Sequence, residues 1–268
     1  MKLMLLTADP VFAKKAVDSG VDRIFLDLEY INKSERQKGR NTFITKNCKE
    51  DIPALRAVVP EGRLLVRVNP LYPGSKEEID SVIKYGADII MLPMAVDAED
   101  VEEFVSLVNG RAVTCPMIET ASAMVHIDDI LAVDGVDEIF IGLNDLHISM
   151  NLRFMFEPLS GGLIDYMADK CHMAEIPFGF GGMAKIGEGV LPAEKILTEH
   201  IRLGSDSVIL SRTFRGEVDS NGKKILDLPK EIAKIRSWEE KINCFTAEDF
   251  ERNRIEVKKI VNSIISEV

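Results

Sequence analysis

The chain has 268 residues, which suffices for one large domain or two small ones, and 46% of them are hydrophobic, enough to fill a buried core. Its net charge of −11, from 33 basic and 44 acidic residues, argues against a basic face for nucleic acid, and no segment is long and apolar enough to span a membrane. The four cysteines form no CxxC pair and the apolar amino terminus is too short for a signal peptide, so we expect a cytoplasmic protein without disulfides.

Short apolar runs alternate with amphipathic stretches along residues 1–215. Strands are predicted at residues 3–6, 23–28, 63–68, 88–92, 112–118, 138–141, 177–180 and 207–210. Helices are predicted at residues 10–19, 51–59, 76–85, 98–108, 121–133, 163–174 and 192–203. Apolar runs without internal alternation indicate strands buried on both faces, hence a parallel sheet. This order predicts an α/β fold, a closed (β/α)8 TIM barrel; the alternative is an open doubly wound sheet, although no GxGxxG motif follows the first strand.

Beyond residue 215 the alternation of strands and helices ends. We predict that residues 216–268 form a C-terminal helical extension to a barrel domain of residues 1–215, with its strongest helix at 248–268. That helix carries an apolar stripe that must cover a surface, either on a neighbouring subunit with which it is exchanged or on its own barrel. The polar residues 30–49, rich in lysine and arginine, are either a lid over a site or a solvated loop.

Charged side chains follow several predicted strands. Glu119 and Asp145 each come after a short apolar strand, and Glu29 and Arg67 lie at the ends of two earlier ones. The carboxyl ends of parallel strands meet at one face, and charges among Leu, Val and Ile are costly to bury unless they are paired or bind something. Glu119 and Asp145 are hard oxygen ligands that suit a magnesium-type ion. Arg67 suits a substrate carboxylate through its two-pronged guanidinium, and Glu29 suits a base or the orientation of a water.

Each of these residues also has a purely structural interpretation, as a member of a buried ion pair. Arg67 and Asp27 are one such possible pair. The carboxyl-terminal half adds Gly181 and Gly182, expected after the seventh strand, and Arg212 after the eighth. Glycine amides and an arginine at this point of a barrel suit an anionic group of the substrate, and the alternative is a tightly packed glycine turn. His147 lies close enough in sequence to reach the site, but we expect it to be a solvated helix residue.

Five short motifs follow one another along the chain: Gly20-Val-Asp-Arg-Ile-Phe-Leu-Asp-Leu-Glu29, Val66-Arg-Val-Asn-Pro70, Gly86-Ala-Asp-Ile-Ile-Met-Leu-Pro93, Met117-Ile-Glu-Thr-Ala121 and Ile139-Phe-Ile-Gly-Leu-Asn-Asp-Leu146. Over about the first 150 residues the chain thereby resembles the HpcH/HpaI aldolase and citrate lyase β-subunit family of the pyruvate/phosphoenolpyruvate barrel superfamily. The resemblance implies a barrel with Glu119 and Asp145 as ligands of Mg²⁺ or Mn²⁺ and Arg67 on the carboxylate of a pyruvate-like or acetyl-derived enolate. It also implies a homo-oligomer, a trimer or hexamer, with exchanged carboxyl-terminal helices.

We therefore predict a divalent-metal-dependent carbon–carbon lyase of the aldolase type, acting on an oxo-acid and an aldehyde through a metal-stabilised enolate. The aldolase branch has a histidine directly after the glutamate of the second strand, and this chain has Tyr30 there. That departure keeps two alternatives open, a citrate-lyase-like acyl-CoA lyase and a non-catalytic ligand-binding barrel or assembly subunit. A Schiff-base aldolase is disfavoured because no lysine lies within an apolar strand end; Lys185 is the nearest.

Overall fold

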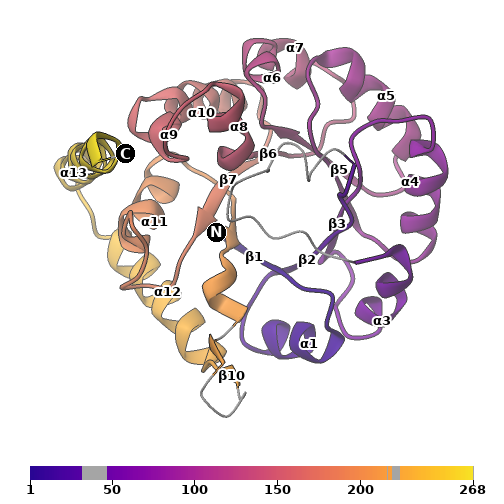
Figure 1. The fold of residues 1–268 in the computed structure, drawn as a ribbon, viewed down its shortest axis with the longest axis horizontal. Helices are drawn as coiled ribbons and strands as arrows, with labels where there is room; N and C mark the ends of the chain where they lie inside the picture. The colour runs from indigo at the N-terminus through magenta and orange to yellow at the C-terminus, as the bar shows by residue number, and fades with distance from the viewer. Residues whose placement is uncertain (32–46, 216, 219–223, 268) are drawn as a thin grey trace.

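A closed barrel of parallel strands forms the centre of the molecule (Figure 1). The structure, a computed structural model, describes residues 1–31, 47–215, 217–218 and 224–267. Within these residues each strand pairs in parallel with the next along the chain, and the eighth pairs with the first. The predicted (β/α)8 TIM barrel is confirmed, and the open doubly wound sheet is excluded because the barrel closes.

The barrel strands are β1 (Lys2–Leu6), β2 (Arg23–Asp27), β3 (Leu64–Arg67), β4 (Ile89–Leu92), β5 (Val113–Ile118), β6 (Ile139–Ile141), β7 (Phe178–Met183) and β8 (Ser207–Leu210). A short antiparallel pair, β9 (Glu217–Val218) and β10 (Lys224–Ile225), lies outside it. The strands match the predicted ones closely, apart from β7, which continues past the predicted end at residue 180. Both faces of the strands are apolar because one face fills the barrel interior and the other meets the helices.

The helices are α1 (Pro10–Asp18), α3 (Ile52–Arg56), α4 (Ser75–Lys84), α5 (Ala98–Val108), α6 (Ala121–Val125), α7 (Ile127–Leu131), α8 (Leu143–Ser149), α9 (Glu157–Ser160), α10 (Leu163–Met173), α11 (Ala193–Arg202), α12 (Leu228–Ile242) and α13 (Ala247–Glu267), with 3-10 turns η1 (Lys49–Asp51) and η2 (Arg212–Arg215). The helix predicted at 121–133 is divided at His126 into α6 and α7. The part of the chain that the structure describes contains no helix with the length and apolarity needed to cross a membrane. Most of residues 30–49, for which both a lid and a solvated loop were considered, lies outside the described residues.

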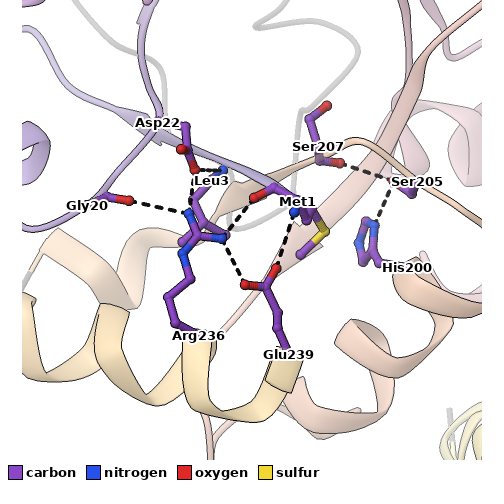
Figure 2. A network of polar contacts seen from close by, with 9 residues as sticks. All are labelled: Met1, Leu3, Gly20, Asp22, His200, Ser205, Ser207, Arg236 and Glu239. Atoms are coloured by element: carbon purple, nitrogen blue, oxygen red, sulfur yellow. Dashed lines mark hydrogen bonds and ion pairs between the residues drawn. The ribbon is translucent and has the colours of Figure 1, made fainter. Parts of the chain in front are cut away.

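Helix α12 completes the ring of helices, between α11 and α1 (Figure 1). Figure 2 shows how Arg236 of α12 joins the amino-terminal end of the barrel: it pairs with Asp22 at 2.6 Å and donates to the Met1 carbonyl at 2.9 Å. Asp22 in turn accepts from the backbone N–H of Leu3 at 2.8 Å. Helix α12 falls within the predicted extension, residues 216–268, but it contacts the barrel helices α11 and α1. The division at residue 215 stays a prediction.

Helix α13 packs on the outside of its own barrel, against α11 and α9 (Figure 1). Val257 and Val261 of the predicted apolar stripe are buried there. Beside them Asn253 donates to Glu199 Oε1 at 2.7 Å, and Glu199 is 1% exposed. Within one chain the barrel thus covers part of the stripe, since Ile260, Ile264 and Ile265 stay half-buried. Exchange of α13 between subunits stays a prediction.

His200 of α11 is a fully buried imidazole stacked on Phe180, with ring centroids 3.7 Å apart and planes 8° from parallel. Its Nδ1 lies 2.9 Å from the Ser205 hydroxyl (Figure 2). Its Nε2 has no hydrogen-bond partner among the described residues. Burial lowers the pKa of His200 from 6.5 to about 3, because the charged ring would lose its hydration without gaining an anion.

We expect the free energy of unfolding to fall as the pH is lowered from 6.5 towards 3. The unfolded chain takes up a proton on His200 in this window and the folded protein does not, which costs about 3 kcal/mol at pH 4. His200→Gln should flatten this dependence in urea unfolding at several pH values. His126→Gln, on an exposed residue, is the control and should keep it. An unchanged pH dependence in His200→Gln would show that the imidazole ionises in the folded state.

Candidate active site

Charged side chains from three strand ends and one helix meet at the carboxyl end of the barrel. Asp27 is the last residue of β2 and Arg67 the last of β3, and the two face each other in register. Glu29 lies two residues beyond β2, Glu119 directly follows β5, and Asp145 lies in the first turn of α8. The four carboxylates are 1–8% exposed. Asp145 therefore enters the site from a helix, not from the strand end where it was predicted.

Arg67 forms a two-pronged ion pair with Asp27. Its Nε and Nη2 donate to the two Asp27 oxygens at 2.9 Å each, and Nη2 lies 3.3 Å from Glu29 Oε2. Burial opposes the charge of Arg67, but Asp27 and Glu29 outweigh it and raise the pKa of the guanidinium. The remaining nitrogen, Nη1, contacts the Met117 sulfur at 3.8 Å.

Arg67 is paired with Asp27, as in the ion-pair alternative. Binding of a substrate carboxylate by Arg67 stays a prediction. A ligand would meet the Nη1 edge of Arg67. Such an arginine acts as a fixed cation, since its carboxylate partners hold its orientation before any ligand arrives.

Glu119 and Asp145 form a pair of buried carboxylates. Burial, and then the negative charge of Asp145, raise the pKa of Glu119 to about 8, although Arg67 opposes the shift. Glu119 Oε1 accepts the backbone N–H of Met94 at 3.0 Å. Asp145 Oδ1 is buried and has no hydrogen-bond partner within the described residues. An unsatisfied carboxylate oxygen beside a second carboxylate is costly, and a divalent cation is the ligand that would satisfy both.

The donor set suits a magnesium-type ion. Among the described residues no group of three or more His, Cys, Asp or Glu side chains surrounds a single point, so there is no all-protein cage. Mg²⁺ in proteins is commonly held by one or two carboxylates and keeps its other positions for water and substrate oxygens. Glu119 and Asp145 fit that pattern.

The glycines predicted to bind an anion lie within β7, not after it. Gly181 has φ +53°, and a Cβ there would be 2.7 Å from the Leu143 side chain, so this glycine lets α8 pack on the strand. Gly182 pairs with Ile209 at a register shift between β7 and β8. These contacts are those of the packing alternative, and anion binding by Gly181 and Gly182 stays a prediction.

Arg212 lies in η2, just after β8, and is exposed. Arg215, three residues on, is half-buried; burial and the charge of Arg212 lower its pKa, while Asp27 opposes the shift. Arg215 is thus within electrostatic range of Asp27, a residue of the site. His147, which we expected to be solvated, is buried in α8, with Nδ1 3.2 Å from the Leu143 carbonyl oxygen.

Two further residues approach Glu119 without having been predicted. Met94 supplies the N–H just described and has φ +59°, a value uncommon outside glycine. Gly142 lies so close that a Cβ on it would be 2.4 Å from Glu119 Oε2. Gly142 lies in the motif Ile139–Leu146, so the sequence did contain a signal for it. No feature of the sequence points to Met94.

Comparisons with known proteins agree with this architecture. The family model HpcH/HpaI aldolase/citrate lyase matches residues 1–155. Over 159 residues the chain is 26% identical to a hydroxypyruvate/pyruvate aldolase of Roseovarius nubinhibens, a match that covers 53% of this chain and 62% of that protein. The match thus spans less than two thirds of that relative.

Solved structures share the fold. An HpcH/HpaI aldolase/citrate lyase family protein from Burkholderia cenocepacia superposes with a TM-score of 0.63 at 15% identity, covering 90% of this chain and 94% of that one. A citrate lyase β subunit from M. tuberculosis, complexed with oxaloacetate and magnesium, superposes with a TM-score of 0.60 at 16% identity, covering 88% and 95%. At such identities the likeness shows the fold alone.

Proposed function

The chain belongs to the HpcH/HpaI aldolase/citrate lyase family, and on this premise we propose that it is a divalent-metal-dependent carbon–carbon lyase of the aldolase type. Its substrates would be a pyruvate-like oxo-acid and an aldehyde. The observation that carries the proposal is the buried pair Glu119 and Asp145, with an unsatisfied Asp145 oxygen, beside the fixed cation Arg67. The pyruvate aldolase among the relatives and the magnesium and oxaloacetate in the citrate lyase structure support it.

Each residue of the site has a role in this chemistry. Glu119 and Asp145 would hold Mg²⁺ or Mn²⁺, which, when bound, polarises the carbonyl group and stabilises the enolate. Arg67, held by Asp27 and Glu29, places a positive charge that needs no rearrangement when negative charge develops on the oxo-acid. Glu29 is our candidate for the base, or for the group that orients a water. Arg212, with Gly181 and Gly182, is our candidate for binding an anionic end of the substrate.

Exchange of the methyl protons of pyruvate in D₂O tests enolate formation without knowledge of the aldehyde. We expect NMR to show exchange with protein and Mg²⁺, loss of exchange with EDTA, and recovery with excess Mn²⁺. Borohydride should trap no pyruvate adduct. Exchange that persists in EDTA, together with a trapped adduct, would establish Schiff-base chemistry instead.

The same assay separates the alternatives. Exchange of acetyl-CoA protons but not of pyruvate protons would favour the citrate-lyase-like acyl-CoA lyase. Mn²⁺ or oxalate binding without any exchange would favour the non-catalytic barrel.

All four cysteines are free, which suits the reducing cytoplasm that we propose as the location of the protein. The homo-oligomer, a trimer or hexamer, also remains a proposal.

A further inference from the structure

Two backbone positions lie against the two carboxylate oxygens of Glu119. Met94, in the loop after β4, donates its N–H to Oε1 at 3.0 Å. Gly142, at the start of α8, lies against the other oxygen: a Cβ built on it would be 2.4 Å from Oε2 and 2.8 Å from the Glu119 Cβ. Real Cβ atoms do not approach other atoms this closely, so any other residue at 142 would displace the carboxylate or be displaced by it.

Gly142 has little freedom to move away. Its N–H donates to the Ile118 carbonyl oxygen at 3.1 Å, in the β5–β6 ladder, and its own carbonyl oxygen accepts from Leu146 at 3.0 Å. Its φ is −84°, which any residue adopts. The position therefore uses the missing side chain of glycine and not its backbone freedom.

Met94 is held in a left-handed conformation, at φ +59°. For a residue other than glycine this costs on the order of 1 kcal/mol or more, so the surroundings must enforce it. Two contacts do so: the N–H of Met94 to Glu119, and the hydroxyl of Thr120, which donates to the Ala95 carbonyl oxygen at 3.2 Å. Hydrogen bonds to Glu119 and Thr120, at the end of β5, thus hold Met94 itself and the residue that follows it.

We propose that Met94 and Gly142 are positioning residues for Glu119, and that Oε2 is the oxygen presented to the divalent cation. Met94 occupies Oε1 and fixes the plane of the carboxylate. Gly142 leaves the room in which Oε2 lies, and the turn that it begins carries Asp145 three residues later. The turn from β6 to α8 thereby sets the positions of both acidic residues: it leaves room for Glu119 and carries Asp145. The inference rests on the proposed metal-dependent function and assigns how its binding geometry is built.

Gly142→Ala tests the space beside Oε2. We expect Mn²⁺ affinity, measured by calorimetry, to fall by about tenfold or more, because groups that orient metal ligands typically contribute that much. The Mn²⁺ electron paramagnetic resonance spectrum should change as well. Gly62→Ala is the control: Gly62 has φ +80° with nothing within 4 Å of a Cβ, so the variant should lose stability and keep Mn²⁺ affinity.

Met94 variants give an independent test that does not depend on Gly142→Ala folding. Met94→Gly removes the strain and keeps the N–H, so it should bind Mn²⁺ as the wild type does and resist heat at least as well. Met94→Val should bind Mn²⁺ about tenfold more weakly, since a β-branched residue strongly disfavours positive φ and turns the N–H away.

The outcomes separate the inference from the proposed function. A wild-type protein that binds no Mn²⁺ overturns both. A wild type that binds Mn²⁺, with Gly142→Ala and Met94→Val binding equally well, overturns the positioning roles and leaves the metal site standing. Weakened binding in both variants, with Gly62→Ala and Met94→Gly unaffected, supports the inference.

Discussion

Glu119→Gln and Asp145→Asn are each expected to abolish Mn²⁺ binding while the protein stays folded. The two side chains are buried beside each other, and Asp145 Oδ1 has no hydrogen-bond partner among the described residues. Glutamine at 119 keeps the oxygen that accepts the Met94 N–H, and it carries no charge for Asp145 and Glu29 to repel. The thermal midpoint should therefore stay level or rise.

Calorimetric titration with Mn²⁺ and thermal unfolding measure the two effects together. Glu199→Gln is the matched control, because Glu199 is equally buried but lies under α13, where it pairs with Arg202 and accepts from Asn253. That variant should lose stability and keep Mn²⁺ affinity. If both site variants titrate like the wild type, the cation binds elsewhere and the metal-site proposal fails.

Arg67→Lys is expected to reduce kcat/KM by about 100-fold, a size typical of losing one preorganised donor beside developing charge. Lysine keeps the charge but loses the planar fork that holds both Asp27 oxygens. Two buried carboxylates then have a poorer partner, so we also expect a loss of about 2 kcal/mol in the free energy of unfolding.

Arg23→Lys separates catalysis from stability. Arg23 makes a similar two-pronged pair with Glu138, at 2.6 and 2.9 Å, at the other end of the barrel. The Arg23→Lys variant should show a comparable loss in the free energy of unfolding, measured in urea. It should retain kcat/KM at temperatures where it is folded. Equal loss of kcat/KM in both variants would reduce Arg67 to a structural ion pair.

The barrel could be predicted because each strand carries a physical signature. A strand such as β4 is apolar at every position, since Ile89 and Met91 face the interior and Ile90 and Leu92 face the helices. The charged residues after such strands stand out for the same reason. Their convergence follows from parallel topology alone.

Features that depend on register, backbone conformation or long-range packing were not predictable. The sequence offered the Arg67–Asp27 ion pair only as an alternative, because its geometry depends on the register of β2 with β3, which a sequence leaves open. The positive φ of Met94 contradicts the preference of methionine and is enforced by its surroundings. Helix α12 is bound to the barrel by Arg236, whose partner Asp22 lies more than two hundred residues away.

A crystal soaked with Mg²⁺ and oxalate tests directly whether Glu119 and Asp145 bind the metal, since oxalate mimics the two oxygens of a pyruvate enolate. We expect octahedral density with one oxygen from Glu119 and one from Asp145 at about 2.0–2.1 Å, oxalate on the same ion, and waters completing the shell. Oxalate bound without a cation, or a cation held by other residues while Glu119 and Asp145 stay apart from it, would contradict this expectation.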